Sequence, residues 1–300
     1  MIWTVSFAGV EVPETVRIKQ NDGSIIELDL DEYLYGVVTS EMGTCYKTDG
    51  EIKEIGIEAL KAQAVASRTY AVYKINCGNY DGYDMTATVN DQVYKNCNAK
   101  DIVKEAVDAT SGQIMTYDEK AICAYFFSTS GGHTEVSENV WSSALPYLKA
   151  VEDPYEPYIE GKSEWEARIS ANKYGEIEVL ETNENGRVYK LKVGDDILFK
   201  NNIRMKLGTS LIKSTWFTVE YDENTNEYVF YGKGFGHGVG MSQHGAMGMA
   251  EAGFNYQEIL EWYYNDIVFE PNGDQYIIVD EENENNNAID KDTNKVDNKY

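Results

Sequence analysis

Glu41 is the carboxylate whose place in the sequence best fits acid–base chemistry. Acidic residues are too numerous, at 51 Asp and Glu, for composition to select a catalytic pair. Glu41 differs because it follows an apolar stretch and precedes Met42 and Gly43, where a short helix is expected to give way to a loop. A carboxylate half removed from water at such a junction has a raised pKa, as a general acid requires near neutral pH. Glu41 is therefore a candidate general acid.

Two serines beside glycines are candidates for nucleophilic catalysis. Ser130 and Ser242 each lie within three residues of a histidine. Neither lies in a Gly-x-Ser-x-Gly sequence, and closeness in sequence does not establish the geometry of a catalytic triad. A serine hydrolase therefore stays an open alternative.

The histidines do not form a recognisable metal-binding pattern. His237 and His244 are seven residues apart, unlike the His-Glu-x-x-His spacing that places two zinc ligands on one helix face. A three-histidine site that includes His133 is an alternative, but no pattern of supporting residues accompanies it. We predict no metal and no cofactor.

Cysteine spacing gives no support for zinc or redox chemistry. No Cys-x-x-Cys pair occurs, and the four cysteines are Cys45, Cys77, Cys97 and Cys123. An exported chain could form up to two disulfides in three pairings, whereas a cytosolic chain would keep the thiols. We expect free or structural thiols.

The glycine-rich run over residues 234–240 precedes an expected helix and has two interpretations. Glycines before a helix can cradle a phosphate through backbone N–H groups. However, the run lacks the Lys-Ser/Thr of a P-loop, and a net charge of −25 disfavours a nucleotide. We favour glycines that allow close backbone packing beneath a cleft.

Arg68 lies on the apolar face of the helix expected over residues 58–75, in line with Leu60, Ala64 and Ala71. A guanidinium in an apolar stripe has to be paired, because a buried charge that loses its partner costs about 3–5 kcal/mol. Arg68 therefore forms either a structural salt bridge or a bond to a catalytic or substrate carboxylate.

Composition narrows the ligand classes. With 26 Lys and Arg against 51 Asp and Glu, the surface repels phosphate backbones and anionic lipid, so nucleic acid is not expected. No stretch approaches the ~18 apolar residues of a membrane helix. The 23 Tyr and 5 Trp supply flat amphipathic rings that can stack on sugars, which makes carbohydrate a first hypothesis.

The elements that would position these residues follow from periodicity and turn signals. Strands are expected over residues 2–7 and 16–18, with a hairpin through Asn21-Asp22-Gly23 to residues 24–28. Helices are expected over residues 30–38, 58–75, 101–110 and 243–264. Residues 44–56 are expected to be a surface insertion, residues 113–128 a hairpin that turns at Asp118-Glu119, residues 123–127 a strand buried on both faces, and residues 188–193 and 217–221 strands.

These elements predict a mixed α+β fold with a β-rich second lobe and a central substrate cleft. Residues 1–159 would form the catalytic core, completed by the glycine-rich loop and C-terminal helix within residues 231–280. Residues 160–230 would be the inserted lobe and the other wall of the cleft. Residues 281–300 have almost no apolar side chains and are expected to be disordered.

Five segments in series resemble the stage II sporulation protein D family. They occur in the family's order and span residues ~1 to 270 of this chain, far more than any single motif covers. The segments are LDEYLYGVVTSEM (30–42), EALKAQAVASRTYA (58–71), STSGG (128–132), VW followed by PYL (140–148) and GFGHGVGMSQ (234–243).

The resemblance implies a lytic transglycosylase that acts on peptidoglycan. Such enzymes cleave the β-1,4 bond between N-acetylmuramic acid and N-acetylglucosamine and leave a 1,6-anhydro end. The sporulation members act on glycan from which a partner amidase has removed the stem peptides. One glutamate suffices, because the C6 hydroxyl of the sugar takes the place of a protein nucleophile.

The resemblance also assigns the site residues. The family's catalytic glutamate corresponds to Glu41, and its functional arginine, tyrosine and lysine to Arg68, Tyr147 and Lys149. Arg68 and Lys149 would position Glu41 or the substrate and tune the proton affinity of Glu41, and Tyr147 would contact a sugar. The expected substrate-binding residues are Ser130, Gly131, Gly132, His237, Ser242 and Gln243.

Two departures from the family pattern bear on the site. Many members carry a zinc-binding cluster of His and Cys before a Gln-Val-Tyr, whereas residues 81–94 here contain neither residue type. We therefore expect no zinc, although Cys77 and Cys97 flank this segment and could form a disulfide. Gly43 replaces the family's usual proline, and the insertion that follows lengthens the loop beside Glu41.

Other functions and the location of the protein stay open at this point. The main rival is a non-catalytic wall-binding module that enhances an amidase, and a metal-dependent peptidase or amidase is the third alternative. The N-terminal residues lack the pattern of a signal peptide. Because the family acts outside the cytoplasmic membrane, we expect an exported or anchored protein whose leader lies outside this sequence.

Overall fold

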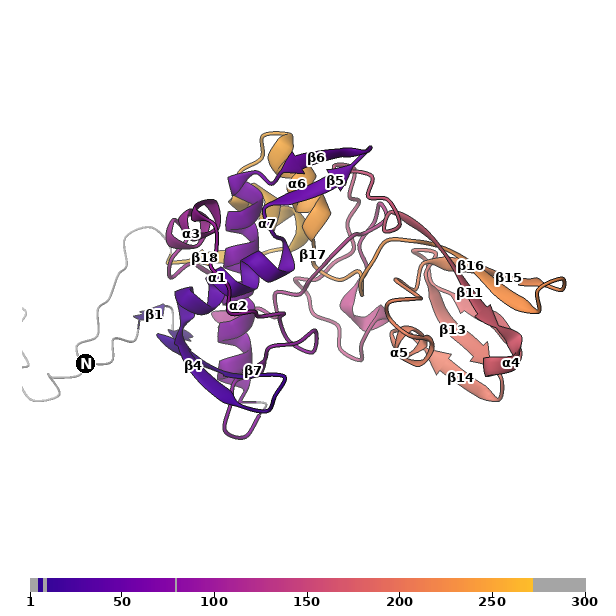
Figure 1. Ribbon diagram of the computed structural model, residues 1–300. Coiled ribbons are helices and arrows are strands. Elements are labelled where there is room, and N and C mark those ends of the chain that lie inside the picture. Colours follow the sequence, from indigo (N-terminus) through magenta and orange to yellow (C-terminus); the bar gives the residue numbers. More distant parts are fainter. Residues whose placement is uncertain (1–4, 8–9, 79, 272–300) are drawn as a thin grey trace, which may run out of the picture.

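The computed structural model describes residues 5–7, 10–78 and 80–271 and has a mixed α+β fold (Figure 1). The helices gather in one part of the molecule, and most of the later strands form a second part beside it. The expectations for residues 2–4 and for the acidic tail lie outside the described residues. The described helices include none that is long and apolar enough to cross a membrane.

The helical part packs around one central helix, α2 (Ile57–Cys77). From Ala59 to Val72 every residue of α2 except Lys61 is buried, as expected for a helix that is covered on all sides. The expectation of a single apolar stripe was therefore too narrow. The helices that contact α2 are α1 (Leu30–Glu41), α3 (Asp101–Asp108), α6 (Gln243–Glu251) and α7 (Tyr256–Tyr263).

Small sheets and hairpins surround these helices. The hairpin predicted through Asn21-Asp22-Gly23 is confirmed, because β3 (Thr15–Lys19) pairs antiparallel with β4 (Ile25–Asp29). The turn predicted at Asp118-Glu119 is also confirmed, between β8 (Ile114–Tyr117) and β9 (Lys120–Ala121). The remaining elements of this part are β1 (Val5–Phe7), β2 (Val10–Val12), β5 (Cys45–Thr48), β6 (Glu51–Glu54), β7 (Met85–Thr86), β10 (Phe126–Phe127), the 3-10 helix η1 (Ser137–Asn139), β17 (Met241–Ser242) and β18 (Val268–Glu270).

The strand-rich part, residues 164–233, has a hydrophobic cluster of its own. One antiparallel sheet has the order β11 (Glu164–Ser170), β16 (Glu227–Lys233), β15 (Phe217–Asp222). A second has the order β12 (Ile177–Thr182), β13 (Val188–Val193), β14 (Asp196–Phe199). Two short helices, α4 (Ala171–Tyr174) and α5 (Asn202–Leu207), complete this part.

Three expected elements differ in the structure. Residues 44–56 form the β5–β6 hairpin, because alternating side chains let the two halves pair. The helix predicted over residues 243–264 is broken, since α6 ends before Gly253, at a φ of 94°, and α7 begins again at a capping box on Asn255. The strand predicted over residues 123–127 covers only Phe126–Phe127, which pairs parallel with β17.

The glycine-rich loop packs closely against the loop that begins at Ser128. A Cβ on Gly234 would lie 2.7 Å from the carbonyl oxygen of Ser130, and one on Gly240 would lie 2.0 Å from that of Tyr125. Both glycines also have positive φ, near 75°. Close backbone packing is therefore the confirmed interpretation of these glycines.

Candidate functional site

Glu41 is the last residue of α1, and two other segments hold its carboxylate. Oε1 accepts the backbone N–H of Val93 at 2.7 Å, and Oε2 accepts Nε2 of Gln243 at 3.3 Å. Gln243 is the first residue of α6, so the carboxylate lies where the ends of two helices meet. The helix-to-loop junction predicted at Glu41 is confirmed.

Burial raises the pKa of Glu41 above its ordinary value. The two hydrogen bonds favour the charged form, but removal of water from the carboxylate outweighs them. A raised pKa keeps more of the carboxylic acid form present toward neutral pH, and that form is the one that donates a proton.

A series of hydrogen bonds between buried side chains holds the Glu41 carboxylate in place. Nε2 of Gln243 also donates to Oε1 of Gln63 at 3.3 Å, and Nε2 of Gln63 donates to the hydroxyl of Ser67 at 2.9 Å. Gln63, Ser67 and Gln243 are buried. The orientation of the carboxylate is therefore set by polar groups of α2 and α6.

Glu41 lines a cavity of about 380 Å³. The walls come from five separate segments: α1, the β5–β6 hairpin, Ser128 after β10, the turn near residue 160, and α6. Besides Glu41 and Gln243, the polar and charged residues of the wall include Tyr46, Ser128, Glu160, Lys162 and His244.

Lys162 and His244 both line this cavity and both bond to Ser128. Nζ of Lys162 donates to the Ser128 hydroxyl at 3.1 Å, and Nδ1 of His244 donates to the Ser128 carbonyl at 2.7 Å. Because Nδ1 carries the proton in that bond, Nε2 of neutral His244 is a hydrogen-bond acceptor. Burial lowers the pKa of Lys162, and the nearby Lys213 charge adds to the effect.

His244 should make folding stability depend on pH. Burial, with a smaller contribution from Lys162, lowers its pKa to about 4. An unfolded histidine takes up a proton near its ordinary pKa of about 6.5, whereas folded His244 stays neutral until about pH 4. The contribution of His244 to the free energy of unfolding is therefore fully present above pH 6.5 and is lost as the pH drops toward 4.

We expect His244 to lower the free energy of unfolding by roughly 2 kcal/mol between about pH 7 and pH 4.5, a contribution that appears as the difference between the wild-type protein and a His244 variant. His244→Asn keeps a donor near Nδ1 and should show a smaller decrease. Denaturant unfolding at both pH values measures the difference for each protein. An equal pH dependence in the variant would contradict the assignment.

The loop that begins at Ser128 is filled by a carboxylate of the protein itself. Glu156 accepts the backbone N–H groups of Ser130 and Gly131 at 2.5 and 2.8 Å, and the Ser242 hydroxyl at 2.7 Å. The Ser130 hydroxyl in turn accepts the N–H of Gly132 at 3.0 Å. Ser130, Gly131, Gly132 and Ser242 therefore hold the fold together at this point, and none of them lines the Glu41 cavity.

Neither serine has the surroundings of a nucleophile. The Ser242 hydroxyl caps α6 by accepting the N–H of Gly245 at 3.2 Å, and no histidine bond to Ser130 or Ser242 occurs among the described residues. The serine hydrolase alternative thus gains no support from the structure.

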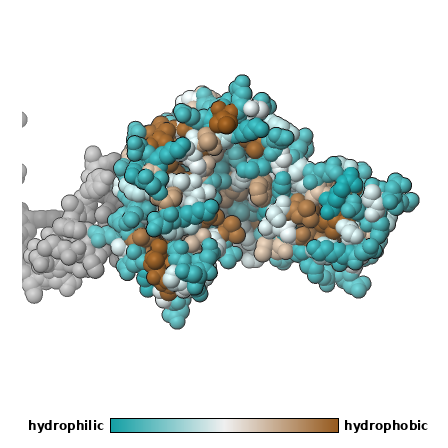
Figure 2. Space-filling view, in the orientation of Figure 1, coloured by the Kyte–Doolittle hydropathy of each residue, from teal (hydrophilic) through white to brown (hydrophobic). Residues whose placement is uncertain are grey.

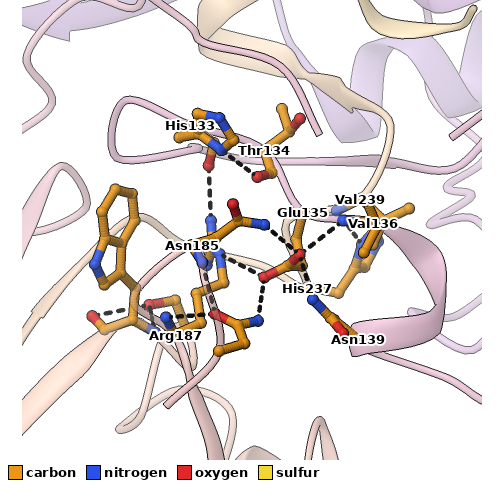
Figure 3. Close-up of polar contacts among 12 residues, drawn as sticks. His133, Thr134, Glu135, Val136, Asn139, Asn185, Arg187, His237 and Val239 are labelled. Atoms are coloured by element: carbon orange, nitrogen blue, oxygen red, sulfur yellow. Dashed lines mark hydrogen bonds and ion pairs between the residues drawn. The ribbon is translucent and has the colours of Figure 1, made fainter. Parts of the chain in front are cut away.

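His237 lies outside the Glu41 cavity as well, near the buried ion pair of Arg187 and Glu135 (Figure 3). Its ring packs among Tyr125, Phe127 and Trp141, and Nδ1 accepts the N–H of Val239 at 3.1 Å. Burial lowers its pKa to about 3. Ring packing therefore engages this side chain, and its expected role in substrate binding stays a prediction.

The three histidines are not brought together. His133 donates from Nδ1 to the carbonyl of Thr134 at 2.7 Å, whereas His237 and His244 lie in the separate settings above. Over residues 5–7, 10–78 and 80–271, no group of three or more His, Cys, Asp and Glu side chains is arranged to hold a metal ion.

Comparison with known proteins identifies the family of this chain. A family model described as "Stage II sporulation protein" matches residues 19–117, and a domain of unknown function matches residues 159–240. Stage II sporulation protein D of Bacillus amyloliquefaciens is 33% identical over 285 residues, which cover 86% of this chain and 79% of that protein. This chain belongs to the stage II sporulation protein D family.

Two further relatives come from Bacillus subtilis (strain 168). Stage II sporulation protein D of that organism is 33% identical over 270 residues, which cover 80% of this chain and 74% of that protein. A protein named Amidase enhancer is 30% identical over 295 residues, which cover 77% of this chain and 39% of that protein.

In this stage II sporulation protein D family member, Arg68 forms a structural salt bridge. Its guanidinium is completely buried, and NH2 lies 2.8 Å from Oδ1 of Asp31. The guanidinium also donates to the carbonyl oxygens of Val107, Thr110 and Gln113. None of these four partners is Glu41, so the structural alternative is the one observed.

Tyr147 and Lys149 also lie outside the Glu41 cavity. The Tyr147 hydroxyl accepts the backbone N–H of Cys123 at 3.0 Å, which explains why Tyr147 is buried. Lys149 is exposed and pairs with Asp266 at 3.2 Å. Of the four residues that the family resemblance assigns to catalysis, the structure thus places Glu41 alone in the cavity.

The segment that holds zinc in many family members does not fit a metal here. Asp84 pairs with Arg17, and Asp91 pairs with Lys74, so two of the acids in residues 81–94 already have cationic partners. All four cysteines are free thiols, and Cys77 and Cys97 form no disulfide. Segment 81–94 instead supplies the N–H of Val93 to Glu41.

The sequence analysis missed several residues of the cavity. Tyr46 comes from the hairpin that was expected to be an insertion, and Glu160 and Lys162 come from the turn before the strand-rich part. Each stands among many similar residues along the chain, so no spacing signal marked them. His244 was noticed as a metal ligand candidate only.

Proposed function

We propose that this chain is a lytic transglycosylase that cleaves peptidoglycan glycan strands between N-acetylmuramic acid and N-acetylglucosamine. The observation that supports it most directly is Glu41, a carboxyl group with a raised pKa at the wall of a cavity. Membership of the stage II sporulation protein D family supports the same reaction class.

In the proposed reaction Glu41 acts twice. Its acid form donates a proton to the glycosidic oxygen, and the C1–O4 bond breaks with its electron pair on that oxygen. The C6 hydroxyl oxygen of the muramic sugar then bonds to C1, and its proton passes to the Glu41 carboxylate. The acid form is restored, no water is consumed, and the product ends in a 1,6-anhydro ring.

The other groups of the cavity have supporting roles. Gln243 and Val93 orient the Glu41 carboxylate, and preorganisation of this kind lowers the barrier without a cost at the moment of reaction. Lys162 and the Nε2 acceptor of His244 offer one donor and one acceptor to sugar substituents.

Digestion of purified glycan strands tests the proposal. Strands with and without stem peptides are incubated with the wild-type protein, with Glu41→Gln as the control for contaminating activity, and the ends are identified by mass spectrometry. We expect 1,6-anhydro ends from the wild-type protein alone, with the peptide-free strands cleaved faster. Reducing ends would show hydrolysis instead, with Glu160 as the second carboxylate that an ordinary glycosidase requires.

A second candidate function is supported by the placement of Arg68, Tyr147 and Lys149 outside the cavity. A wall-binding module that enhances a partner amidase needs the cavity for binding alone, and one relative is named Amidase enhancer. Binding of both glycan forms without cleavage, together with faster peptide release by an added amidase, would favour this function.

The proposed substrate also sets the location. Peptidoglycan lies outside the cytoplasmic membrane, so the chain would act there as an exported or anchored protein. The partners would then be glycan strands and a cell-wall amidase. Accessibility of the protein to protease in intact cells tests the location.

A further inference from the structure

A second open groove lies on the strand-rich part, away from Glu41. It has a volume of about 590 Å³ and runs over the sheet of β11, β16 and β15. Four aromatic residues line it, of which Trp165 and Phe217 are buried and Trp216 and Tyr231 are not. The charged side chains of the lining are those of Glu164, Glu166 and Lys233. The family model that covers this region has no assigned function.

Tyr231 stands in the middle of the groove with its ring open to solvent. It lies on the central strand β16, opposite Glu166 of β11 and Thr218 of β15, and is 45% exposed. Side chains directly opposite on one sheet face are near neighbours. An exposed ring is therefore flanked by hydrogen-bonding groups on both sides, an arrangement that suits the apolar face and hydroxyl rim of a sugar.

Trp216 contacts Arg187, a residue that links the strand-rich part to the loop that begins at Ser128. The guanidinium of Arg187 lies 5.1 Å from its ring, and NH2 of Arg187 donates to the carbonyl oxygen of Ser130. The same NH2 donates to the carbonyl oxygen of His133 (Figure 3). Arg187 also lies 3.8 Å from the buried carboxylate of Glu135. The indole N–H of Trp216 has no hydrogen-bond partner among the described residues and is available to a ligand.

The groove and the Glu41 cavity are lined by neighbouring stretches of the chain. Ile159, Glu160 and Lys162 line the cavity, and Glu164 and Glu166, just beyond in the chain, line the groove. The turn at residues 159–163 is fixed at both ends, since Ser163 donates to Ile159 and accepts from Gly234 at the end of β16. This turn is therefore the segment that leads from the lining of the cavity to the lining of the groove.

We propose that this groove binds the glycan strand where it continues beyond the Glu41 cavity, a role that rests on the proposed function for its ligand. A polymer substrate is longer than a cavity of about 380 Å³ can hold, so the remainder of the strand must lie on the surface. Most of the visible face is hydrophilic, with separate apolar groups on the helical and strand-rich parts (Figure 2). Contacts remote from the reacting bond raise the efficiency of cleavage through binding energy.

Binding of peptide-free glycan to Glu41→Gln protein tests this role, because cleavage is then removed from the measurement. Tyr231→Ala is expected to weaken binding of long strands roughly three- to thirtyfold while a tetrasaccharide binds as before. Trp216→Ala should act in the same direction. Isothermal titration calorimetry with long strands and with the tetrasaccharide supplies the comparison.

Tyr221→Ala is the matched control, since Tyr221 is 48% exposed on the neighbouring strand β15 but lies outside the groove. Its binding of long strands should stay within about twofold of the parent. Equal affinity of Tyr231→Ala and the parent for long strands would overturn the proposal. Failure of the proposed function would show separately, as absence of cleavage by the wild-type protein.

Discussion

Replacement of Glu41 by glutamine is expected to lower kcat for glycan cleavage by about 10²–10⁴-fold, the usual contribution of a positioned acid–base group. An amide cannot release a proton to the glycosidic oxygen. The pH dependence of the wild-type protein should agree with this role. Because burial raises the pKa of Glu41, the active acid form persists above the ordinary range of a glutamic acid and is lost as the pH rises through that pKa.

The hydrogen bonds around residue 41 can adapt to the amide, so the variant should stay folded. The carbonyl oxygen of a glutamine still accepts the N–H of Val93. Its NH2 group faces Gln243, and rotation of the Gln243 and Gln63 amides reverses the chain of donors. The chain ends at the Ser67 hydroxyl, which donates as readily as it accepts.

Kinetics on peptide-free strands, with melting temperatures for each protein, measure the effect. Glu41→Asp shortens the side chain by one methylene, and a misplacement of about 1 Å costs roughly 10² in rate. Glu160→Gln is the matched control, a carboxylate of the same cavity with no assigned proton transfer, and should lose less than about tenfold. Full activity of Glu41→Gln would refute the assignment.

Local signals in the sequence were sufficient for most elements and for Glu41. The periodicity that predicts α1 also places its C-terminal end at Glu41, where a carboxylate becomes partly desolvated. The break between α6 and α7 was missed, because the helix formers on both sides mask a capping box at Asn255.

Tertiary contacts account for what the sequence could not reveal. Arg68 lies within the apolar face of α2 whether it meets Asp31 or a substrate, and only the packing of α1 and α3 against α2 decides between them. Likewise, the sequence alone left the backbone N–H groups of Ser130 and Gly131 available to a ligand, whereas in the folded protein they donate to Glu156. Lys162 is also positioned at the cavity by a long-range contact, its hydrogen bond to Ser128.

Replacement of Arg68 by methionine is expected to lower the free energy of unfolding by about 3–5 kcal/mol. Methionine keeps much of the volume but removes the guanidinium, and so the carbonyl oxygens of Val107 and Thr110 lose buried donors. Asp31 loses its ion pair with Arg68 but keeps the hydrogen bond from the Ser111 hydroxyl. The melting temperature should fall by roughly 6–20 °C for a protein of this size.

Stability and kinetics measured on the same samples separate this structural role from a catalytic one. Arg17→Met is the matched control, because the Arg17–Asp84 ion pair is 2.7 Å long, against 2.8 Å for Arg68–Asp31, but its guanidinium is exposed. This variant should leave the melting temperature almost unchanged. Well below its melting temperature, Arg68→Met should cleave glycan at the wild-type rate per folded molecule, since Arg68 touches neither Glu41 nor the cavity. A variant of normal stability that has lost kcat would instead place Arg68 in the reaction.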